Sequence, residues 1–303
     1  MPAYLSHAIM SEQLYNESSK DEKLFKIPIS KSELKGFSLG NDLSLVSKRL
    51  TKDPQNSNTK DFFLSMIKYI KENNLIENPH IISLLYGHIS HYFLDINCHP
   101  LIYYIEFGCK QIGAIPPHDL IEGYLSSYLT EKILNKDIMD INQTYFNKIN
   151  LSNKEIVTLL NKIYGNLYGD HKIIKTYRHV INLFTLLEKS IKNNLLSKKE
   201  IINLLKFQEF LEQNNLTKEE INNELHYIYR HPLTGETHSE SFLELYSKSI
   251  EMTKEALDVT NKYLYENESI SELEVIFTNL SYDTGVDCSL GREFIHTRKR
   301  IKK

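Results

Sequence analysis

Apolar residues recur every three or four positions along most of this chain, which is the spacing of amphipathic helices. Between residues 60 and 74 one helical face is apolar and the opposite face carries lysines. The apolar face comprises Phe62, Phe63, Met66, Ile67 and Ile70. Similar spacing covers residues 120–129, 172–192 and 241–265, and we find no sustained strand-like alternation. The pattern predicts an all-α fold.

Four pairs of residues have the capping-box pattern of Ser or Thr followed three positions later by Glu, which predicts helix starts. The pairs are Ser152/Glu155, Ser197/Glu200, Thr217/Glu220 and Ser271/Glu274. Glycine and proline mark loops at 36–40, 113–117, 232–235 and 285–291. No composition shift marks a linker and no repeat is present. We therefore predict a single multi-helix domain over residues 1–303.

Composition limits the class of protein and the compartment in which it is expected. A chain of 303 residues that is 41% hydrophobic can bury a large core, and its net charge of -3 gives no general attraction to nucleic acid. The exception is the basic tail, residues 298–303, which we interpret as a solvated end. Three cysteines cannot form a disulfide framework, which favours a reducing compartment. With neither a signal peptide nor a transmembrane segment evident, we expect a cytoplasmic protein.

The segment 87–100 carries polar side chains at metal-ligand spacing within an apolar helical run. His91, Asp95 and His99 follow one another at four-residue intervals, and His88 precedes them. Because a helix turns about 100° per residue, the four share one stripe. Imidazole nitrogens beside a carboxylate suit zinc. A buried carboxylate without a partner would be costly, so the stripe predicts a metal site.

A second pair with the same spacing is His118 and Glu122, directly before an apolar helical pattern. A structural interpretation competes, because Asp119 and Glu122 also form a helix-capping pattern after Pro116 and Pro117. Two ligand-type pairs about twenty residues apart favour the metal interpretation.

The pattern Gly87-x3-His91-Tyr92-x2-Asp95-x3-His99-Pro100, followed by His118-x3-Glu122, resembles the zinc-dependent phospholipase C superfamily, which includes single-strand nucleases. Further likeness to its unsecreted bacterial branch lies in Met1-Pro2-Ala3-Tyr4 with His7, in Gly40-Asn41-Asp42, and in 231–236 with Ser241-Phe242. The resemblance implies an all-α fold, up to three zinc ions and cleavage of a phospholipid or another phosphodiester. The metal-binding half would be residues 1–135, with residues 136–303 packed around it.

The family's ligands carry over by motif. One zinc would be held by His91, Asp95 and Asp42, with Asp95 bridging to a second zinc held by His7 and the chain's N-terminus. If Met1 is removed, Pro2 would supply that amine. The third zinc would be held by the remaining candidates, His99, His118 and Glu122. Asp42 would also align or deprotonate the attacking water.

The chain departs from the family at two points. Relatives supply another histidine within the region matching residues 43–61, where this chain has none, and Gln55 or Asn56 stands nearest the expected place. An amide oxygen binds zinc less well than imidazole, so the first zinc is expected to bind loosely or be absent. The Asp95–His99 spacing is shorter than in secreted members. We expect the helix to end before Pro100 and turn His99 toward a neighbouring site.

Other candidate residues have simpler explanations. His88 could replace the missing ligand, but a hydrogen-bonded helix histidine is the better interpretation. Cys98 lies about 100° off the stripe and suits core packing. The remaining histidines suit surface or structural roles; they are His171, His179, His226, His231, His238 and His296.

Several functions stay open at this level. A nuclease or nucleotidase would use the same metals, and a degenerate member would keep the helical shell for a noncatalytic binding role. Exposed tyrosines and phenylalanines beside the site would favour a phospholipase, whereas a basic groove with stacking aromatics would favour a nuclease. An HD-type phosphohydrolase built on His118-Asp119 lacks partner ligands at suitable distances. The sequence leaves the oligomeric state open.

Overall fold

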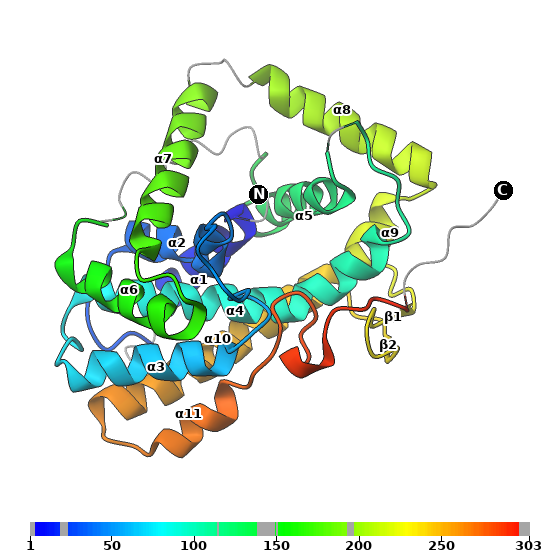
Figure 1. Cartoon of the computed structure of the whole chain (residues 1–303). Coiled ribbons are helices and arrows are strands. Elements are labelled where there is room, and N and C mark those ends of the chain that lie inside the picture. Colours follow the sequence, from blue (N-terminus) through cyan, green and yellow to red (C-terminus); the bar gives the residue numbers. More distant parts are fainter. Residues whose placement is uncertain are drawn as a thin grey trace.

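The computed structural model describes residues 4–18, 24–113, 115–137, 149, 151–192 and 197–296. Helices dominate this part of the chain (Figure 1). In chain order the elements are α1 (Tyr4–Ser18), α2 (Lys31–Phe37), the 3-10 helix η1 (Gly40–Ser44), α3 (Thr59–Glu72), α4 (Pro79–Glu106), α5 (Pro117–Leu134), α6 (Lys154–Tyr168), α7 (Ile173–Lys192), α8 (Ser197–Asn214), α9 (Lys218–Asn222), β1 (Tyr229–Arg230), β2 (Thr237–His238), α10 (Phe242–Tyr265), α11 (Ile270–Ile276) and the 3-10 helix η3 (Cys288–Leu290). The all-α prediction is confirmed.

The long helix α4 forms the centre of the structure (Figure 1). Its 28 residues are mostly apolar, and almost all from Ile81 to Ile105 are buried, the polar stripe included. A helix with no side facing solvent must be surrounded by other elements. Accordingly α1, α2, α3, α5, α6 and α10 all contact α4, so helices from both halves of the sequence share its surface. Any polar side chain on the middle of α4 is thereby held inside the protein.

The amphipathic segments fold as their spacing predicts. Residues 60–74, 172–192 and 241–265 correspond to α3, α7 and α10 to within two residues at each end. Phe62, Phe63 and Ile70 of α3 are fully buried. Periodicity along the helix therefore identified the faces that form the core.

The helix starts were predicted less accurately. Thr217/Glu220 does form a capping box, and so does Ser241/Glu244 at α10, which is not among the four predicted pairs. The other starts are shifted, because Asn153 caps α6 and Ser269 caps α11. Asparagine and serine one or two residues away offer equivalent oxygen acceptors, so the pattern fixed the region but not the residue. The side chains of Ser197/Glu200 lie outside the described residues.

The expectation that a helix ends before Pro100 is wrong, because α4 continues through Pro100 to Glu106. Proline has no N–H to donate to the carbonyl of residue 96, so one backbone hydrogen bond is lost there. Burial of the helix around Pro100 compensates for that loss, since Leu101, Ile102 and Ile105 are all buried. His99 therefore points from the middle of a helix and not from its end.

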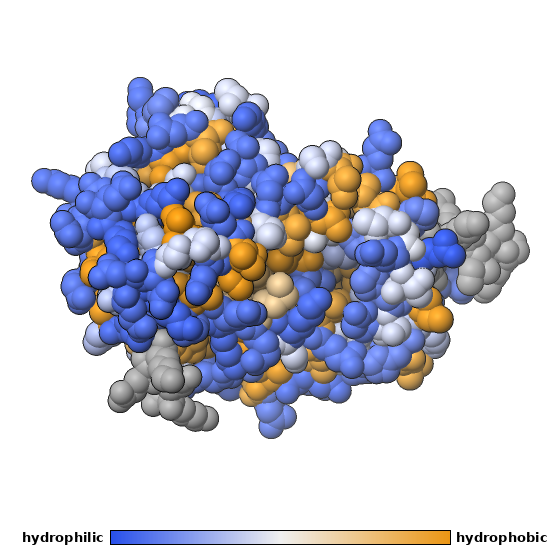
Figure 2. Space-filling model, turned by 90° about the horizontal axis from the view of Figure 1, so that it is seen from below, coloured by the Kyte–Doolittle hydropathy of each residue, from blue (hydrophilic) through white to orange (hydrophobic). Residues whose placement is uncertain are grey.

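The remaining described features are a small hairpin and the molecular surface. β1 and β2 form a two-residue antiparallel hairpin with Tyr229 opposite His238. Hydrophilic side chains cover much of the face in Figure 2, and apolar ones form separate clusters between them. Among the described helices none combines the length and apolar character needed to cross a bilayer.

Pro2 and the basic tail lie outside the described residues. The single domain with two halves stays a prediction.

Candidate metal centre

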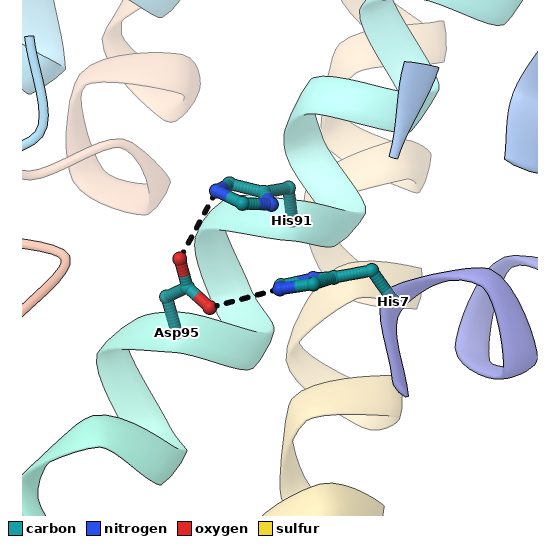
Figure 3. A group of neighbouring side chains, drawn as sticks. All are labelled: His7, His91 and Asp95. Atoms are coloured by element: carbon teal, nitrogen blue, oxygen red, sulfur yellow. Dashed lines mark ion pairs between the residues drawn. The ribbon is translucent and has the colours of Figure 1, made fainter. Parts of the chain in front are cut away.

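The first group of polar side chains joins α1 to the middle of α4. His91 and Asp95 lie one turn apart on α4, with His91 Nε2 3.0 Å from Asp95 Oδ2. His7 of α1 approaches from the neighbouring helix and places its Nε2 3.2 Å from Asp95 Oδ1. The carboxylate thus stands between two imidazoles (Figure 3). All three side chains are buried, and each offers a ligand atom within 4.8 Å of the others.

Among the described residues His7 Nδ1 has no hydrogen-bond partner although it is buried, and the only side chains that His91 Nε2 faces closely are the carboxylates of Asp95 and Asp42. His91 Nδ1 donates to the carbonyl of Ser38 at 3.0 Å, which leaves Nε2 with a lone pair directed into the group. Buried polar atoms are rarely left unsatisfied, and an imidazole whose other nitrogen is anchored by a carbonyl is typical of metal-ligating histidine. These residues therefore fit a zinc ion.

Asp42 stands at the edge of this group on η1. Its Oδ1 lies 3.6 Å from His91 Nε2, and its side chain is 36% exposed. Gly40 has φ +48°, and a Cβ there would lie 2.5 Å from the His91 ring, so only glycine lets η1 approach so closely. Gln55 Nε2 donates to Asp42 Oδ1 at 2.6 Å. Gln55 thus stands beside Asp42, where the sequence suggested that an amide replaces histidine, whereas Asn56 bonds to Asp53 and Asp283.

The second group joins α4 to α5. Glu122 Oε1 lies 3.3 Å from His99 Nε2 and 3.1 Å from His118 Nε2. Both histidines have their other nitrogen anchored, because His99 Nδ1 donates to the Tyr282 carbonyl at 2.9 Å and His118 Nδ1 lies 2.6 Å from Glu106 Oε2. Each Nε2 therefore points into the group. This arrangement also has the form of a zinc-ligand set.

The competing explanations of the second pair fail. Helix α5 begins at Pro117 without any side-chain cap, so Asp119 and Glu122 do not form a capping box. Glu122 points inward to the two histidines. Among the described residues Asp119 belongs to neither group of ligands, which leaves no support for an HD-type site.

Asp95 connects the two groups. Its Oδ1 lies 3.2 Å from His7 Nε2 and 3.8 Å from His99 Nε2, while its Oδ2 faces His91. One carboxylate therefore reaches histidines of both groups, which is the geometry needed for a bridging ligand. Spacing along α4 placed Asp95 between His91 and His99, but the approach of His7 depends on the packing of α1.

The buried carboxylates of the site raise the pKa values of its histidines. Burial lowers the pKa of His91, but Asp95 and Asp42 raise it to about 8. Burial likewise opposes protonation of His99 and His118, whereas the neighbouring carboxylates raise their pKa values to about 9 and about 11.

The carboxylates respond differently according to their surroundings. Burial raises the pKa of Glu122, but the charge on His118 outweighs it and the pKa is lowered. Burial also raises the pKa of Asp42, and the charge of Asp95 adds to the effect. Without metal, protons on the imidazoles balance the buried carboxylates, and a cation of higher charge can take their place.

Other histidines lie elsewhere. His88 Nδ1 donates to the Leu84 carbonyl, and its Nε2 lies 3.4 Å from the Tyr177 hydroxyl, away from both groups. Burial lowers the pKa of His88 to about 3, so it stays neutral. Cys98 is buried in the core. Three residues that anchor the ligands were not predicted from the sequence, namely Ser38, Glu106 and Tyr282. Two of these act through backbone carbonyls, which carry no sequence signal.

Fold and site together define an all-α protein with two histidine–carboxylate groups suited to divalent metal. A model of the zinc dependent phospholipase C family matches residues 2–217. The chain belongs to this family, as the resemblance of its motifs predicted. Comparisons with curated proteins and with solved structures found no match. The assignment to an unsecreted bacterial branch stays a prediction.

Proposed function

We propose that this protein is a zinc-dependent hydrolase of phosphodiesters that acts on phospholipids as a phospholipase C. The observation that carries the proposal is the position of the buried Asp95 carboxylate between two ligand groups, with imidazole nitrogens of both groups directed at it. Bringing several carboxylates and imidazoles together inside the protein costs desolvation free energy, and a bound cation offsets that cost.

In this proposal His7, His91, Asp95 and Asp42 hold zinc at the first group, and His99, His118 and Glu122 hold it at the second. Up to three zinc ions bind if the N-terminal amine of Pro2 contributes. When bound, zinc lowers the pKa of a coordinated water and neutralises charge on the phosphate oxygens. Asp42 would orient the attacking water and accept its proton, because its side chain is the most exposed carboxylate of the site and Gln55 fixes it.

The surroundings of the second group favour a lipid. The centroid of the Tyr103 ring lies 5.1 Å from that of His118 and 4.9 Å from that of Phe294, on which Tyr103 stacks. Phe107 packs against the Phe294 ring. Phe107 is 48% exposed and Ile295 is 71% exposed. Because these aromatic rings pack against one another, they offer an apolar rim instead of free platforms for bases. Exposed apolar side chains beside a hydrolytic site suit a substrate at a membrane surface.

The test is metal analysis followed by hydrolysis assays. Protein purified without chelator should contain at least two zinc ions per chain and should hydrolyse phosphatidylcholine vesicles and p-nitrophenyl phosphorylcholine. Less than one zinc per chain would leave only the degenerate, noncatalytic alternative. Zinc-bound protein that cleaves single-stranded DNA in preference to both lipid substrates would replace the phospholipase with a nuclease. Cytoplasmic location stays part of the proposal and is tested by fractionation.

A further inference from the structure

A loop in the last part of the chain contacts the metal centre although it lies outside the residues matched by the family model. We call residues 281–285 the Tyr282 loop. The Tyr282 carbonyl accepts the hydrogen bond of His99 Nδ1, and the Tyr282 N–H donates to the Gln55 carbonyl at 2.9 Å. The Tyr282 hydroxyl accepts from Asn41 Nδ2 at 3.1 Å, next to Asp42. One buried loop residue therefore touches the supports of both ligand groups.

The loop is seated on α4 between two ligands. Pro100 cannot donate to the Ile96 carbonyl, so that oxygen is free of its usual helical partner. Gly285 lies against it, and a Cβ at Gly285 would be 2.2 Å from Ile96 O. Gly285 also has φ +66°, which a side chain disfavours. The irregularity of α4 at Pro100 is thus where the loop packs, within one turn of Asp95 and His99.

His231 holds the other side of the loop. It follows β1, is 4% exposed, and its Nδ1 accepts from the N–H groups of Leu233 and Thr234 at 3.2 and 3.1 Å. Its Nε2 must then carry the proton, and it donates to the Thr284 carbonyl at 2.7 Å. A single imidazole thus links the hairpin turn to the Tyr282 loop.

We propose that the Tyr282 loop, fixed by His231 and Gly285, is the element that positions His99 for zinc at the second group. The inference rests on the proposed zinc site. The Tyr282 carbonyl fixes both the tautomer and the rotation of the His99 ring, so that Nε2 faces Glu122. Outer hydrogen bonds of this kind typically change metal affinity by about 10-fold to 100-fold. His99 thus needs a part of the chain far beyond the family-matched residues.

The first test compares two glycine variants by zinc titration against a chromophoric chelator. Gly285→Ala should push the loop off α4 and weaken zinc at the second group by about 10-fold or more. Gly113→Ala is the matched control, because Gly113 also has positive φ (+59°) but has no atom within 4 Å of a built Cβ. The control should keep wild-type affinity. The second-group zinc is identified as the class that His118→Ala removes.

The second test separates the two functions of the His231 ring. The amide nitrogen of glutamine can replace Nε2 and donate to Thr284, whereas the oxygen of asparagine replaces Nδ1 and serves only the hairpin. His231→Gln should therefore keep zinc affinity at the second group, and His231→Asn should lower it by about 10-fold. In a double variant, His118→Ala removes the zinc of the second group. Adding His231→Asn to it should then leave the affinity for the remaining zinc unchanged.

The outcomes are distinct. The inference stands if Gly285→Ala and His231→Asn weaken the second zinc class while Gly113→Ala and His231→Gln do not. Any other pattern among folded variants overturns it, including equal losses in both His231 variants, which would indicate hairpin stability alone. If Gly285→Ala does not fold, the His231 pair decides. Wild-type protein that binds zinc without hydrolysing phosphodiesters refutes the proposed function only, whereas wild-type protein that binds no zinc refutes both.

Discussion

Replacing Gly40 by alanine should damage the first ligand group specifically. The added Cβ would lie 2.5 Å from Cγ and Cδ2 of the His91 ring and 2.8 Å from its Cβ. Ordinary van der Waals contact begins near 3.4 Å. The η1 helix and the His91 ring must therefore move apart by about 0.9 Å, which is the difference between 3.4 and 2.5 Å. Either Asp42 or His91 must move by that amount.

The expected effects follow from this displacement. Misplacing a catalytic group by about 1 Å costs about 100-fold in turnover. Alanine at φ +48° adds a backbone cost of about 1–2 kcal/mol to the free energy of folding. We therefore expect hydrolysis to fall about 100-fold, with weaker zinc at the first group and an unchanged second group.

The assay measures hydrolysis of p-nitrophenyl phosphorylcholine, zinc titration and urea unfolding on the same preparations. Gly113→Ala controls for backbone strain, since it should lose a similar free energy of unfolding while turnover stays at the wild-type level. A Gly40→Ala protein with wild-type turnover and zinc affinity would show that close approach of η1 to His91 has no role in the reaction.

Three further predictions concern charge and protons. Asp95→Asn and His91→Ala should each abolish hydrolysis while the helical circular dichroism spectrum is retained; turnover in both would contradict the mechanism. Glu106→Gln removes the carboxylate that anchors His118 Nδ1, so zinc affinity at the second group should fall about 10-fold in a chelator competition, and an unchanged affinity would argue against that anchoring. In the presence of a metal chelator, the stability contributed by His99 and His118 should be complete below pH 6.5, because their folded pKa values of about 9 and about 11 lie above the unfolded value. It should be lost as the pH rises through about 9 for His99 and through about 11 for His118. Thermal melts across this range should show the decline, whereas zinc affinity should rise with pH because binding displaces these protons; opposite trends would refute the assignment.

Local spacing predicted much of this protein because helices are short-range structures. The 3.6-residue period identified α3, α7 and α10, and the four-residue interval placed His91, Asp95 and His99 on one side of α4. The same reasoning failed at Pro100. Local sterics disfavour proline inside a helix, but packing on all sides of α4 outweighs the lost hydrogen bond.

The composition of the candidate site was therefore largely readable from the sequence. Residue types suited to zinc occur at recognisable intervals, and the structure brings His118 and Glu122 together with His99. Capping chemistry was an equal local explanation for that pair. The orientation of Glu122 toward His99, which belongs to another helix, is what separated the two explanations.

The sequence by itself determined which residues are candidate metal ligands and which helical faces are apolar, because both depend on residue type and on neighbours within one or two turns. Only the tertiary structure decided which groups meet. The approach of His7 to Asp95 and the contact of the Tyr282 carbonyl with His99 join residues far apart in the chain, and the hydrogen bond from Gln55 to Asp42 joins separate elements. Such contacts depend on how the helices and loops pack, and backbone carbonyls leave no trace in the sequence.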